Sequence, residues 1–213
     1  MKIVFDNILP DPLKEYPHAA DSLWNNYHVI ESCQKVLINA ASGKGKTTFT
    51  HLLAGLRHDY QGELLFNSAS THTFSVLDWL EIRQTKFSFV FQDLQLFPTL
   101  SSEENLLINT RLKGGMAIEK LKEWAAYLGI ETKWNTPAGI MSMGQQQRLA
   151  ILRALSQPFE TIVMDEPFSH LDEQNTRLAI SLIEERCKEL SAGLILTTLD
   201  PTDKISIDKE IKL

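Results

Sequence analysis

One short stretch of this sequence has the residue types and spacing that phosphate chemistry requires. Residues 40–48 read A-A-S-G-K-G-K-T-T, so small residues lead directly to Lys46 and Thr47. The backbone N–H groups of such a loop, and of the helix that follows it, favour an anion. The lysine reaches the β- and γ-phosphates of a nucleotide, and the hydroxyl beside it holds Mg²⁺. The sequence therefore predicts a phosphate-binding loop, although the pattern usually begins with glycine and this chain has Ala40.

The segments on either side of the loop support this interpretation. Residues 35–39 form a short apolar run that predicts a buried strand, and residues 49–56 carry apolar side chains at helical spacing. Strand, loop and helix in this order are the context that a phosphate-binding loop needs. The alternative is an ordinary strand-to-helix turn with a surface lysine, and the flanking context argues against it.

Two adjacent carboxylates follow a second apolar run. Asp165 and Glu166 come directly after residues 161–164, which predict another buried strand. At the carboxyl end of a parallel strand, both would face the crevice that contains the phosphate-binding loop. Asp165 suits Mg²⁺, mainly through water, and Glu166 suits a general base that polarises the attacking water. Neighbouring acidic residues also occur on surfaces by chance, but the loop upstream favours the functional interpretation.

The composition limits the kinds of protein that the chain can be. With 213 residues, 43% of them hydrophobic, it suits one large domain or one domain with an inserted lobe. The formal net charge of −6 argues against a general nucleic-acid surface. No apolar run approaches the roughly 20 residues that cross a bilayer, and the N-terminus does not resemble a secretory signal. Cys33 and Cys187 lie far apart in the sequence, so we expect two reduced thiols.

Strands and helices alternate along most of the chain, which predicts a largely parallel sheet wrapped by helices. The stretch 9–18 carries three prolines and is predicted to be a loop. Besides the segments named above, we expect helices at 75–83 and 179–190, and strands at 2–5, 27–30, 62–67, 87–91, 194–198 and 207–213.

Residues 93–140 differ from the rest, because they predict consecutive helices with no strand between them. Ser101 and Glu104 form a capping box for a helix that ends near Gly114, and Gly129 ends a second helix. We therefore expect a helical lobe inserted into the α/β core.

Five motifs follow one another in an order that is specific to one family. After residues 40–48 come F-V-F-Q-D at 89–93, M-S-M-G-Q at 141–145, I-V-M-D-E-P at 162–167 and S-H-L-D at 169–172. They resemble, in turn, the Walker A, Q-loop, signature, Walker B and D-loop motifs of ATP-binding cassette (ABC) transporters. Over residues 35–213 the chain resembles the nucleotide-binding subunit of such a transporter.

The resemblance implies one ABC ATPase domain over residues 1–213, with residues 93–140 as its helical subdomain. The implied fold class is α/β: a P-loop NTPase core with a mostly parallel sheet, antiparallel edge strands and an inserted helical lobe. The implied ligands are ATP and Mg²⁺, and the implied reaction is ATP hydrolysis coupled to transport.

The same resemblance implies roles for individual residues. Catalysis would involve Glu166, Gln92 and Lys46, and the metal would be held by Thr47, Gln92 and Asp165. The implied nucleotide contacts are Tyr16, Ser42, Gly43, Lys44, Gly45, Lys46, Thr47, Thr48, Ser142, Gly144, Gln145 and Asp172. Tyr16, thirty residues before Lys46, resembles the aromatic residue that stacks on adenine, and Tyr27 and Trp24 are alternatives.

Two kinds of partner are implied as well. In this family two nucleotide-binding subunits close head to tail around two ATP molecules, here as a homodimer or a heterodimer. The signature helix of one subunit then meets the γ-phosphate held by the other. Ser142 and Gln145 form a capping box at the start of this helix, a role compatible with phosphate binding.

The second kind of partner is a pair of transmembrane permease subunits, which would contact the helical lobe and the loop of Gln92. A chain of this family would lie in the cytoplasm, peripheral on the inner face of the cell membrane. We expect no nucleic-acid partner.

The chain departs from the family pattern at two positions. Met143 stands where the signature usually has its first glycine, which lets phosphate approach the backbone. Leu199 stands where the family has its switch histidine, and leucine can neither donate to the γ-phosphate nor hold the water. Turnover would therefore be slow.

Three functions from different classes are compatible with these features. The first is an ATPase subunit that powers a membrane transporter. The second is an ATP-binding gating or regulatory cassette with weak turnover, and the third is a soluble cassette protein without a membrane partner. Glu166 favours the first function, whereas Leu199 and Met143 favour the second. The short single cassette and the acidic charge count against the third.

Overall fold

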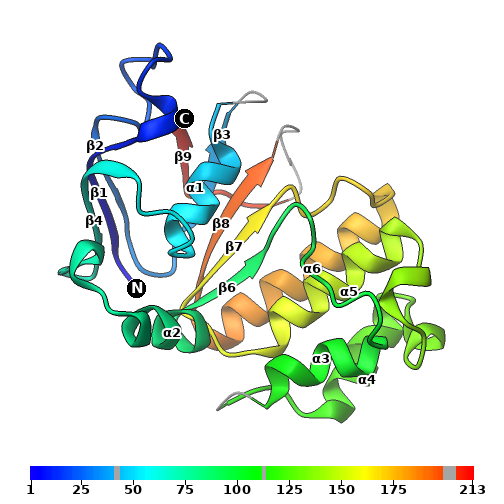
Figure 1. The fold of residues 1–213 in the computed structure, drawn as a ribbon. Helices are drawn as coiled ribbons and strands as arrows, with labels where there is room; N and C mark the ends of the chain where they lie inside the picture. Colours follow the sequence, from blue (N-terminus) through cyan, green and yellow to red (C-terminus); the bar gives the residue numbers. More distant parts are fainter. Residues whose placement is uncertain (41–43, 112–113, 199–204) are drawn as a thin grey trace.

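The computed structural model describes residues 1–40, 44–111, 114–198 and 205–213. The chain folds into a five-stranded parallel sheet, a four-stranded antiparallel sheet and helices that cover them (Figure 1). This confirms the α/β fold class that the sequence predicts. The antiparallel strands do not extend the edges of the parallel sheet but form a sheet of their own.

The parallel sheet positions the predicted site. Its strands, in spatial order, are β6 (Phe87–Val90), β7 (Thr161–Asp165), β8 (Gly193–Thr198), β3 (Lys35–Asn39) and β9 (Lys209–Lys212). Asp165 is in register with Thr197, and Asn39 is in register with Thr198. Strands β7, β8 and β3 therefore end at the same edge of the sheet. Every strand predicted for this sheet is present.

The antiparallel sheet has the order β2 (Tyr27–Ile30), β1 (Ile3–Pro10), β4 (Tyr60–Phe66) and β5 (Ala69–Ser70). The loop predicted at 9–18 is wrong at its first two residues, because Leu9 and Pro10 pair with Gln61 and Tyr60. A register shift precedes them, so the proline lies at the end of an interrupted ladder, where its missing N–H costs little. The loop then continues with a short 3₁₀ turn, Asp11–Leu13.

Helix α1 (Lys46–Leu53) packs in the space between the two sheets (Figure 1). Its Phe49 stacks on Phe5 of β1 with the ring centroids 5.6 Å apart, and both rings are fully buried. Val163 of β7 points into this cluster of apolar residues. Helix α2 (Val76–Thr85), predicted at 75–83, begins after a capping box made by Ser75 and closes the lower end of the cluster.

The opposite face of the parallel sheet is covered by α5 (Met143–Ser156) and α6 (Glu173–Leu190), with Ile162 and Met164 of β7 in their shared core. Helices α3 (Ser102–Thr110) and α4 (Ile118–Tyr127) pack beside α5 (Figure 1). Short 3₁₀ turns at Glu131–Lys133 and Ala138–Ile140 follow. The described part of 93–140 contains no strand.

The predicted helices are present, but some boundaries differ. The helix expected at 49–56 is α1 (Lys46–Leu53), and the helix expected at 179–190 already begins at Glu173. Ser101 and Glu104 form the predicted capping box at the start of α3, and Gly129 follows α4 with φ of +65°. Helix α3 ends at Thr110, earlier than the predicted end near Gly114. Both cysteines are free thiols, as predicted. Among the described residues, no helix has the length and apolar character that crossing a bilayer requires.

Candidate functional site

The predicted phosphate-binding loop begins at the end of β3 and leads into α1. Gly45, just before α1, has φ of +98°, which residues with a Cβ atom adopt at a cost. A Cβ atom there would also lie 2.8 Å from Cδ1 of Leu13, so the end of this side chain packs closely against Gly45. Ser42 and Gly43, two of the predicted nucleotide contacts, lie outside the described residues, as does Leu199.

Lys46 is the first residue of α1, and its side chain is buried. Its ammonium group donates a hydrogen bond to the carbonyl oxygen of Ala40 at 3.1 Å. It also lies 3.2 Å from a carboxylate oxygen of Glu166. The lysine predicted to bind phosphate is therefore paired here with the residue predicted to be the general base.

Asp165 ends β7 and is buried beside two hydroxyl groups. Its carboxylate accepts a hydrogen bond from Oγ1 of Thr47 at 3.4 Å and a shorter one from Oγ1 of Thr197. Burial raises the pKa of the Asp165 carboxyl above its usual value, and the hydrogen bond from Thr197 opposes this rise. The site thus combines a desolvated carboxylate with the hydroxyl groups that stabilise its charge.

The oxygen atoms of Thr47 and Asp165 fit a magnesium ion. Mg²⁺ in phosphate sites takes one or two protein oxygens and completes its shell with water and phosphate oxygens. The described residues contain no cluster of three or more His, Cys, Asp or Glu side chains that suits a metal. A magnesium site with few protein ligands, completed by the phosphates of a nucleotide, is consistent with the Thr47–Asp165 pair and with the absence of a larger cluster among the described residues.

Glu166 follows Asp165 with φ of 48°, an uncommon conformation for a residue with a Cβ atom. Its N–H donates to the carbonyl oxygen of Thr197 at 2.9 Å, which ties this conformation to β8. Backbone strain of this kind costs about 1–3 kcal/mol and concentrates at functional sites. The structure therefore maintains a strained backbone at the position predicted for the general base.

Not every predicted residue joins this group. Gln92 lies two residues beyond β6, the neighbour of β7, so it leaves the sheet at the same edge as Asp165. Its side chain is exposed and makes no hydrogen bond to the other predicted site residues that the structure describes. Lys44 is exposed and Thr48 is half-buried in the first turn of α1.

The signature motif lies apart from the phosphate-binding loop, because α1 and α5 flank opposite sides of the parallel sheet (Figure 1). Ser142 and Gln145 form the predicted capping box: Gln145 N–H donates to Ser142 Oγ at 3.3 Å, and Ser142 N–H donates to Gln145 Oε1 at 3.0 Å. Met143 is the first residue of α5 and is half exposed. The free amides at the start of α5 thus lie at the surface beside a methionine side chain.

The start of α5 is in contact with the D-loop of the same chain. A Cβ atom on Gly144 would lie 2.9 Å from the carbonyl oxygen of His170, which is closer than side chains approach. Asp172 caps α6 by accepting a hydrogen bond from the Asn175 N–H at 2.8 Å, and this bond lowers the pKa of Asp172. The predicted nucleotide contacts Gly144 and Asp172 therefore both have structural roles within the chain.

The three aromatic candidates for adenine stacking differ in position. Tyr16 is 58% exposed, after the short turn that contains Leu13. Tyr27 is 63% exposed at the start of β2. Trp24 is buried, and its Nε1 donates to the carbonyl oxygen of Lys44 at 3.4 Å. Trp24 thus supports the phosphate-binding loop through this hydrogen bond. The side chains of the two tyrosines are exposed and available to a ligand.

Sequence reasoning missed two contributors to the site. Thr197 binds Asp165 from β8, and the signal was a polar residue at the end of a buried strand. Leu13 packs against Gly45 and is buried, although it lies in the stretch predicted to be a loop. Both contacts depend on which elements become neighbours in the fold. Local sequence patterns do not predict the order of the strands in a sheet.

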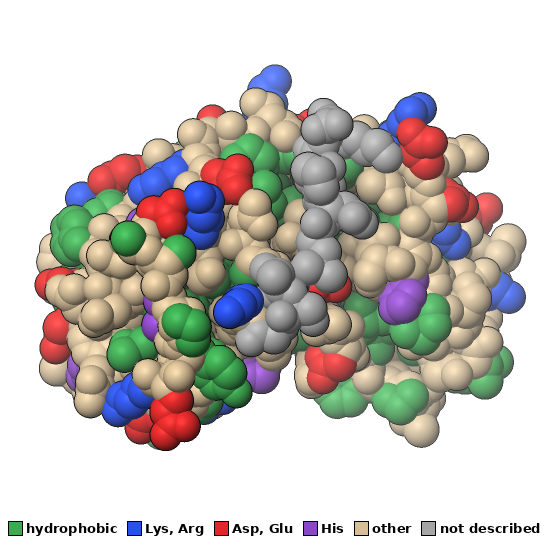
Figure 2. Space-filling model, turned by 90° about the horizontal axis from the view of Figure 1, so that it is seen from above, with side chains coloured by type: hydrophobic (Ala, Val, Ile, Leu, Met, Phe, Trp, Pro, Cys, Tyr) green, Lys and Arg blue, Asp and Glu red, His purple; other side chains and the backbone are tan. Residues whose placement is uncertain are grey.

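Figure 2 looks down on the face to which the carboxyl ends of the parallel strands point. On this face the acidic and basic side chains of the described residues are interspersed, and they form no continuous basic stripe. A nucleic-acid surface gathers lysine and arginine on one face. The charge distribution over the candidate site therefore does not have that character.

Comparisons with known proteins agree with this arrangement. The family model described as "ABC transporter" matches residues 28–169. The "Lipoprotein-releasing system ATP-binding protein LolD" of Buchnera aphidicola subsp. Acyrthosiphon pisum is 34% identical over 168 residues, covering 76% of this chain and 72% of that protein. The "Glucose import ATP-binding protein GlcV" of Saccharolobus solfataricus is 33% identical over 181 residues, covering 84% of this chain and 51% of that protein.

Solved structures give the same result. The structure described as "Dimeric Structure of MJ0796, a Bacterial ABC Transporter Cassette" superimposes with a TM-score of 0.77 and 26% identity, covering 94% of this chain and 88% of that chain. A post-hydrolysis state of the same cassette, bound to ADP and Pi, superimposes with a TM-score of 0.74 and the same coverage. With the family model matching about two thirds of its length, the chain belongs to the ABC transporter family.

Proposed function

We propose that this chain binds and hydrolyses Mg-ATP between two head-to-tail nucleotide-binding subunits and thereby drives transport by membrane-embedded partners. The observation that carries the proposal is the gathering of Lys46, Thr47, Asp165 and Glu166 at one edge of the parallel sheet. Lys46 lies 3.2 Å from Glu166, and Thr47 lies 3.4 Å from Asp165. Family membership supplies the general activity, that of an ATP-binding cassette with ATPase function.

Hydrolysis would begin when the phosphates of ATP replace the Glu166 carboxylate as the partner of Lys46. The ammonium group then neutralises the β- and γ-phosphates. Glu166, released from its ion pair, accepts a proton from the water that attacks the γ-phosphorus. The bond from the γ-phosphorus to the bridging oxygen breaks, and ADP and phosphate result. Thr47 and Asp165, with Gln92 as the third proposed ligand, would hold Mg²⁺, which would supply positive charge to the phosphate oxygens.

A second subunit would complete each site. The dimeric state of the cassette MJ0796 supports this part of the proposal. In it, the exposed start of α5 in one subunit would offer Ser142, Gly144 and Gln145 to the γ-phosphate held by the other. Tyr16 would stack on adenine, and Asp172 would lie at the interface between the subunits.

The membrane-embedded partners would contact the helical lobe and the loop of Gln92. In this proposal residues 1–213 act as one ABC ATPase domain, with 93–140 as its helical subdomain, in the cytoplasm and peripheral on the inner face of the membrane. The names of the relatives mention lipoprotein release in one case and glucose import in another, so they support a transport role without indicating one cargo.

Steady-state ATP hydrolysis by the purified chain tests the proposal. We expect Mg²⁺-dependent phosphate release that Glu166→Gln abolishes while ATP binding persists. ATP binding with no phosphate release in the unaltered chain would instead support a gating cassette, the function that Met143 and Leu199 favour. Absence of ATP binding would refute both functions.

A further inference from the structure

Strand β8 places a hydroxyl group beside the proposed metal ligand Asp165. Thr197 is in register with Asp165 on the neighbouring strand β7, and its side chain is fully buried. Its Oγ1 donates a hydrogen bond to Oδ1 of Asp165, whereas Oγ1 of Thr47 donates to Oδ2 at 3.4 Å. The two oxygens of this carboxylate therefore have different partners, one on β8 and the other on α1.

The pleat of the sheet directs both side chains towards the site. Two residues earlier on the same two strands, Val163 and Ile195 point into the apolar cluster that contains Phe49 of α1. Side chains along a strand alternate between the two faces with a period of two. Asp165 and Thr197 therefore also face α1, the helix that follows the phosphate-binding loop.

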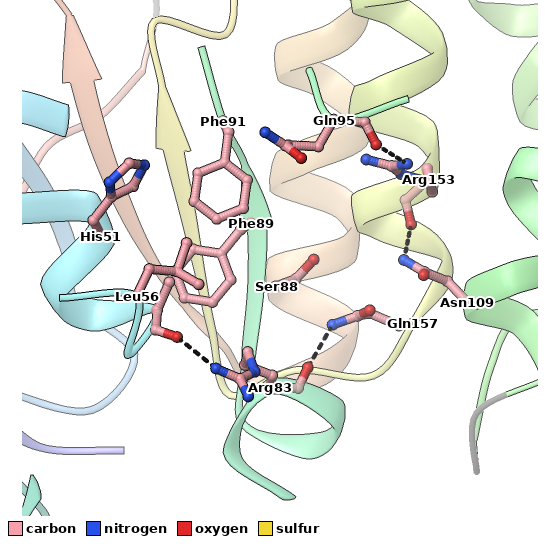
Figure 3. Close-up of a pocket in the computed structure, with 11 residues that line it drawn as sticks. His51, Leu56, Arg83, Ser88, Phe89, Phe91, Gln95, Asn109, Arg153 and Gln157 are labelled. Atoms are coloured by element: carbon pink, nitrogen blue, oxygen red, sulfur yellow. Dashed lines mark hydrogen bonds between the residues drawn. The ribbon is translucent and has the colours of Figure 1, made fainter. Parts of the chain in front are cut away.

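Other buried hydroxyl groups of the chain have backbone partners. Ser88 of β6, which lines the groove drawn in Figure 3, donates to the carbonyl oxygen of Ala154 at 2.7 Å. Thr50 and Ser156 donate to carbonyl oxygens of their own helices. A buried hydroxyl group can thus be satisfied without a charged group. The hydroxyl of Thr197 bonds to a carboxylate instead, so it acts on the charge of the candidate site.

This hydrogen bond matters because Asp165 is only 1% exposed. A carboxylate with so little access to water relies on protein donors to stabilise its charged form, which is the form that binds a metal. The bond to Oδ1 also restrains rotation of the carboxylate, so that Oδ2 stays on the side of Thr47. Thr197 thus influences both the charge and the orientation of Asp165.

The backbone of Thr197 has a separate partner. Its carbonyl oxygen accepts the hydrogen bond from the Glu166 N–H at 2.9 Å. A substitution of the Thr197 side chain leaves this backbone bond available. The effect of the hydroxyl group on Asp165 can therefore be tested without removing the bond that ties Glu166 to β8.

We propose that Thr197 is a positioning residue for the metal: its hydroxyl holds the Asp165 carboxylate so that the other oxygen, together with Thr47, takes part in binding Mg²⁺, directly or through water. The inference rests on the proposed function, which supplies Mg-ATP. It deepens that function by naming the residue that sets how much the metal contributes to nucleotide affinity. Hydrogen-bonding partners of metal-binding groups typically have such an effect.

Two dissociation constants of one nucleotide test the proposal. Mant-AMP-PNP, a fluorescent analogue that is not hydrolysed, is titrated into the full chain with excess Mg²⁺ and again with EDTA. The ratio of the two Kd values measures the contribution of the metal. Thr197→Val removes the hydroxyl with little change in shape, and should reduce this ratio by about 10–100-fold, with a ratio of one as the lower limit. The Kd in EDTA should not change.

Matched variants separate this role from a structural one. Thr197→Ser keeps the hydroxyl and should keep the ratio of the unaltered chain. Thr161→Val makes the same change in a buried threonine at the opposite end of β7, and should also keep it. A thermal melt without nucleotide verifies folding, and Thr197→Ala replaces Thr197→Val if the latter is unfolded. Equal rises of both Kd values would show a merely structural role and overturn the proposal. An unchanged ratio in the folded variant would also overturn it, as would Thr197→Ser behaving like Thr197→Val.

The unaltered chain distinguishes the two levels of the argument. If it binds mant-AMP-PNP more tightly with Mg²⁺ and Thr197→Val does so equally, only this inference is wrong. If it binds no nucleotide under either condition, the proposed function fails, and this inference fails with it.

Discussion

The ammonium group of Lys46 lies 3.2 Å from a carboxylate oxygen of Glu166, so the proposed phosphate ligand and the proposed base neutralise each other. The exposed fractions of the two side chains are 9% and 18%, and salt screens such a pair only weakly. Removing one partner of a buried pair leaves the other charge uncompensated. A substitution of Lys46 or Glu166 therefore also changes the electrostatic environment of the other residue.

Lys46→Ala should abolish the binding of Mg-ATP while the chain remains folded, because it removes the buried cation that we propose binds the phosphates. At an ATP concentration 100 times the Kd, binding stabilises a protein by about 2.7 kcal/mol. For a chain of this size that raises the Tm by roughly 5–11 °C. Thermal melting with and without Mg-ATP should show this shift in the unaltered chain and in Lys188→Ala, but not in Lys46→Ala. A full shift in Lys46→Ala would refute the assignment of the phosphate-binding loop.

Glu166→Gln should make the chain dimerise in the presence of ATP. The substitution keeps the size of the side chain and removes the base, so the closed state with two ATP molecules should persist. It also releases Lys46 from its ion pair, which should favour ATP. Size-exclusion chromatography with and without ATP would report the change.

A monomer under both conditions, at high protein concentration, would count against the head-to-tail arrangement. Met143→Gly in the Glu166→Gln background is then the informative variant. If Met143 alone obstructs the interface, the double variant should dimerise.

Asp165→Asn should raise the Tm at pH 7 without nucleotide and reduce the shift caused by Mg-ATP. The pKa of Asp165 is raised in the folded state, so the folded chain binds this proton more readily than the unfolded chain does. The free energy of unfolding therefore falls as the pH rises from the usual pKa of 3.8 through the raised value, and stays lower above it. The Tm difference between Asp165→Asn and the unaltered chain should narrow as the pH falls towards 4. An equal difference at both pH values would mean that the charge of Asp165 is not its cause.

Much of the fold follows from local patterns. The strands at 35–39 and 194–198 are apolar along their length, and the capping boxes at Ser101 and Ser142 mark helix starts without reference to the rest of the chain. Local patterns failed where the secondary structure of a residue depends on pairing with a distant strand. Pro10 belongs to a strand because Tyr60 pairs with it, and no pattern near Pro10 shows that.

The site was predictable to a similar degree. That Lys46 and Asp165 share one edge follows from placing each after a parallel strand. The hydrogen bond from Thr197 to Asp165 depends on β8 lying beside β7. The ion pair of Lys46 with Glu166 is formed by a residue with a positive φ, which no local pattern indicates. Strand order and backbone strain arise only in the folded chain.

Leu199→His should raise kcat with little change in KM, if the chain lacks only the polar contact that the family's switch histidine makes. One polar contact in the transition state is typically worth about 10²–10³ in rate, or roughly 3–4 kcal/mol. ATP hydrolysis kinetics of the two proteins, with thermal melting beside them, would measure the gain. A stable Leu199→His protein with no faster turnover would indicate that another group already performs this role.

The contact between Gly144 and the carbonyl oxygen of His170 has a consequence for cooperativity. His170 follows the Walker B strand, which in the proposed dimer would serve the ATP of its own chain, whereas Gly144 belongs to the motif that would face the other ATP. A Cβ atom at Gly144 would lie 2.9 Å from the His170 carbonyl, so a residue larger than glycine would push the two segments apart. In the proposed dimer this close packing would couple the two ATP sites, so we expect ATP binding with a Hill coefficient above one.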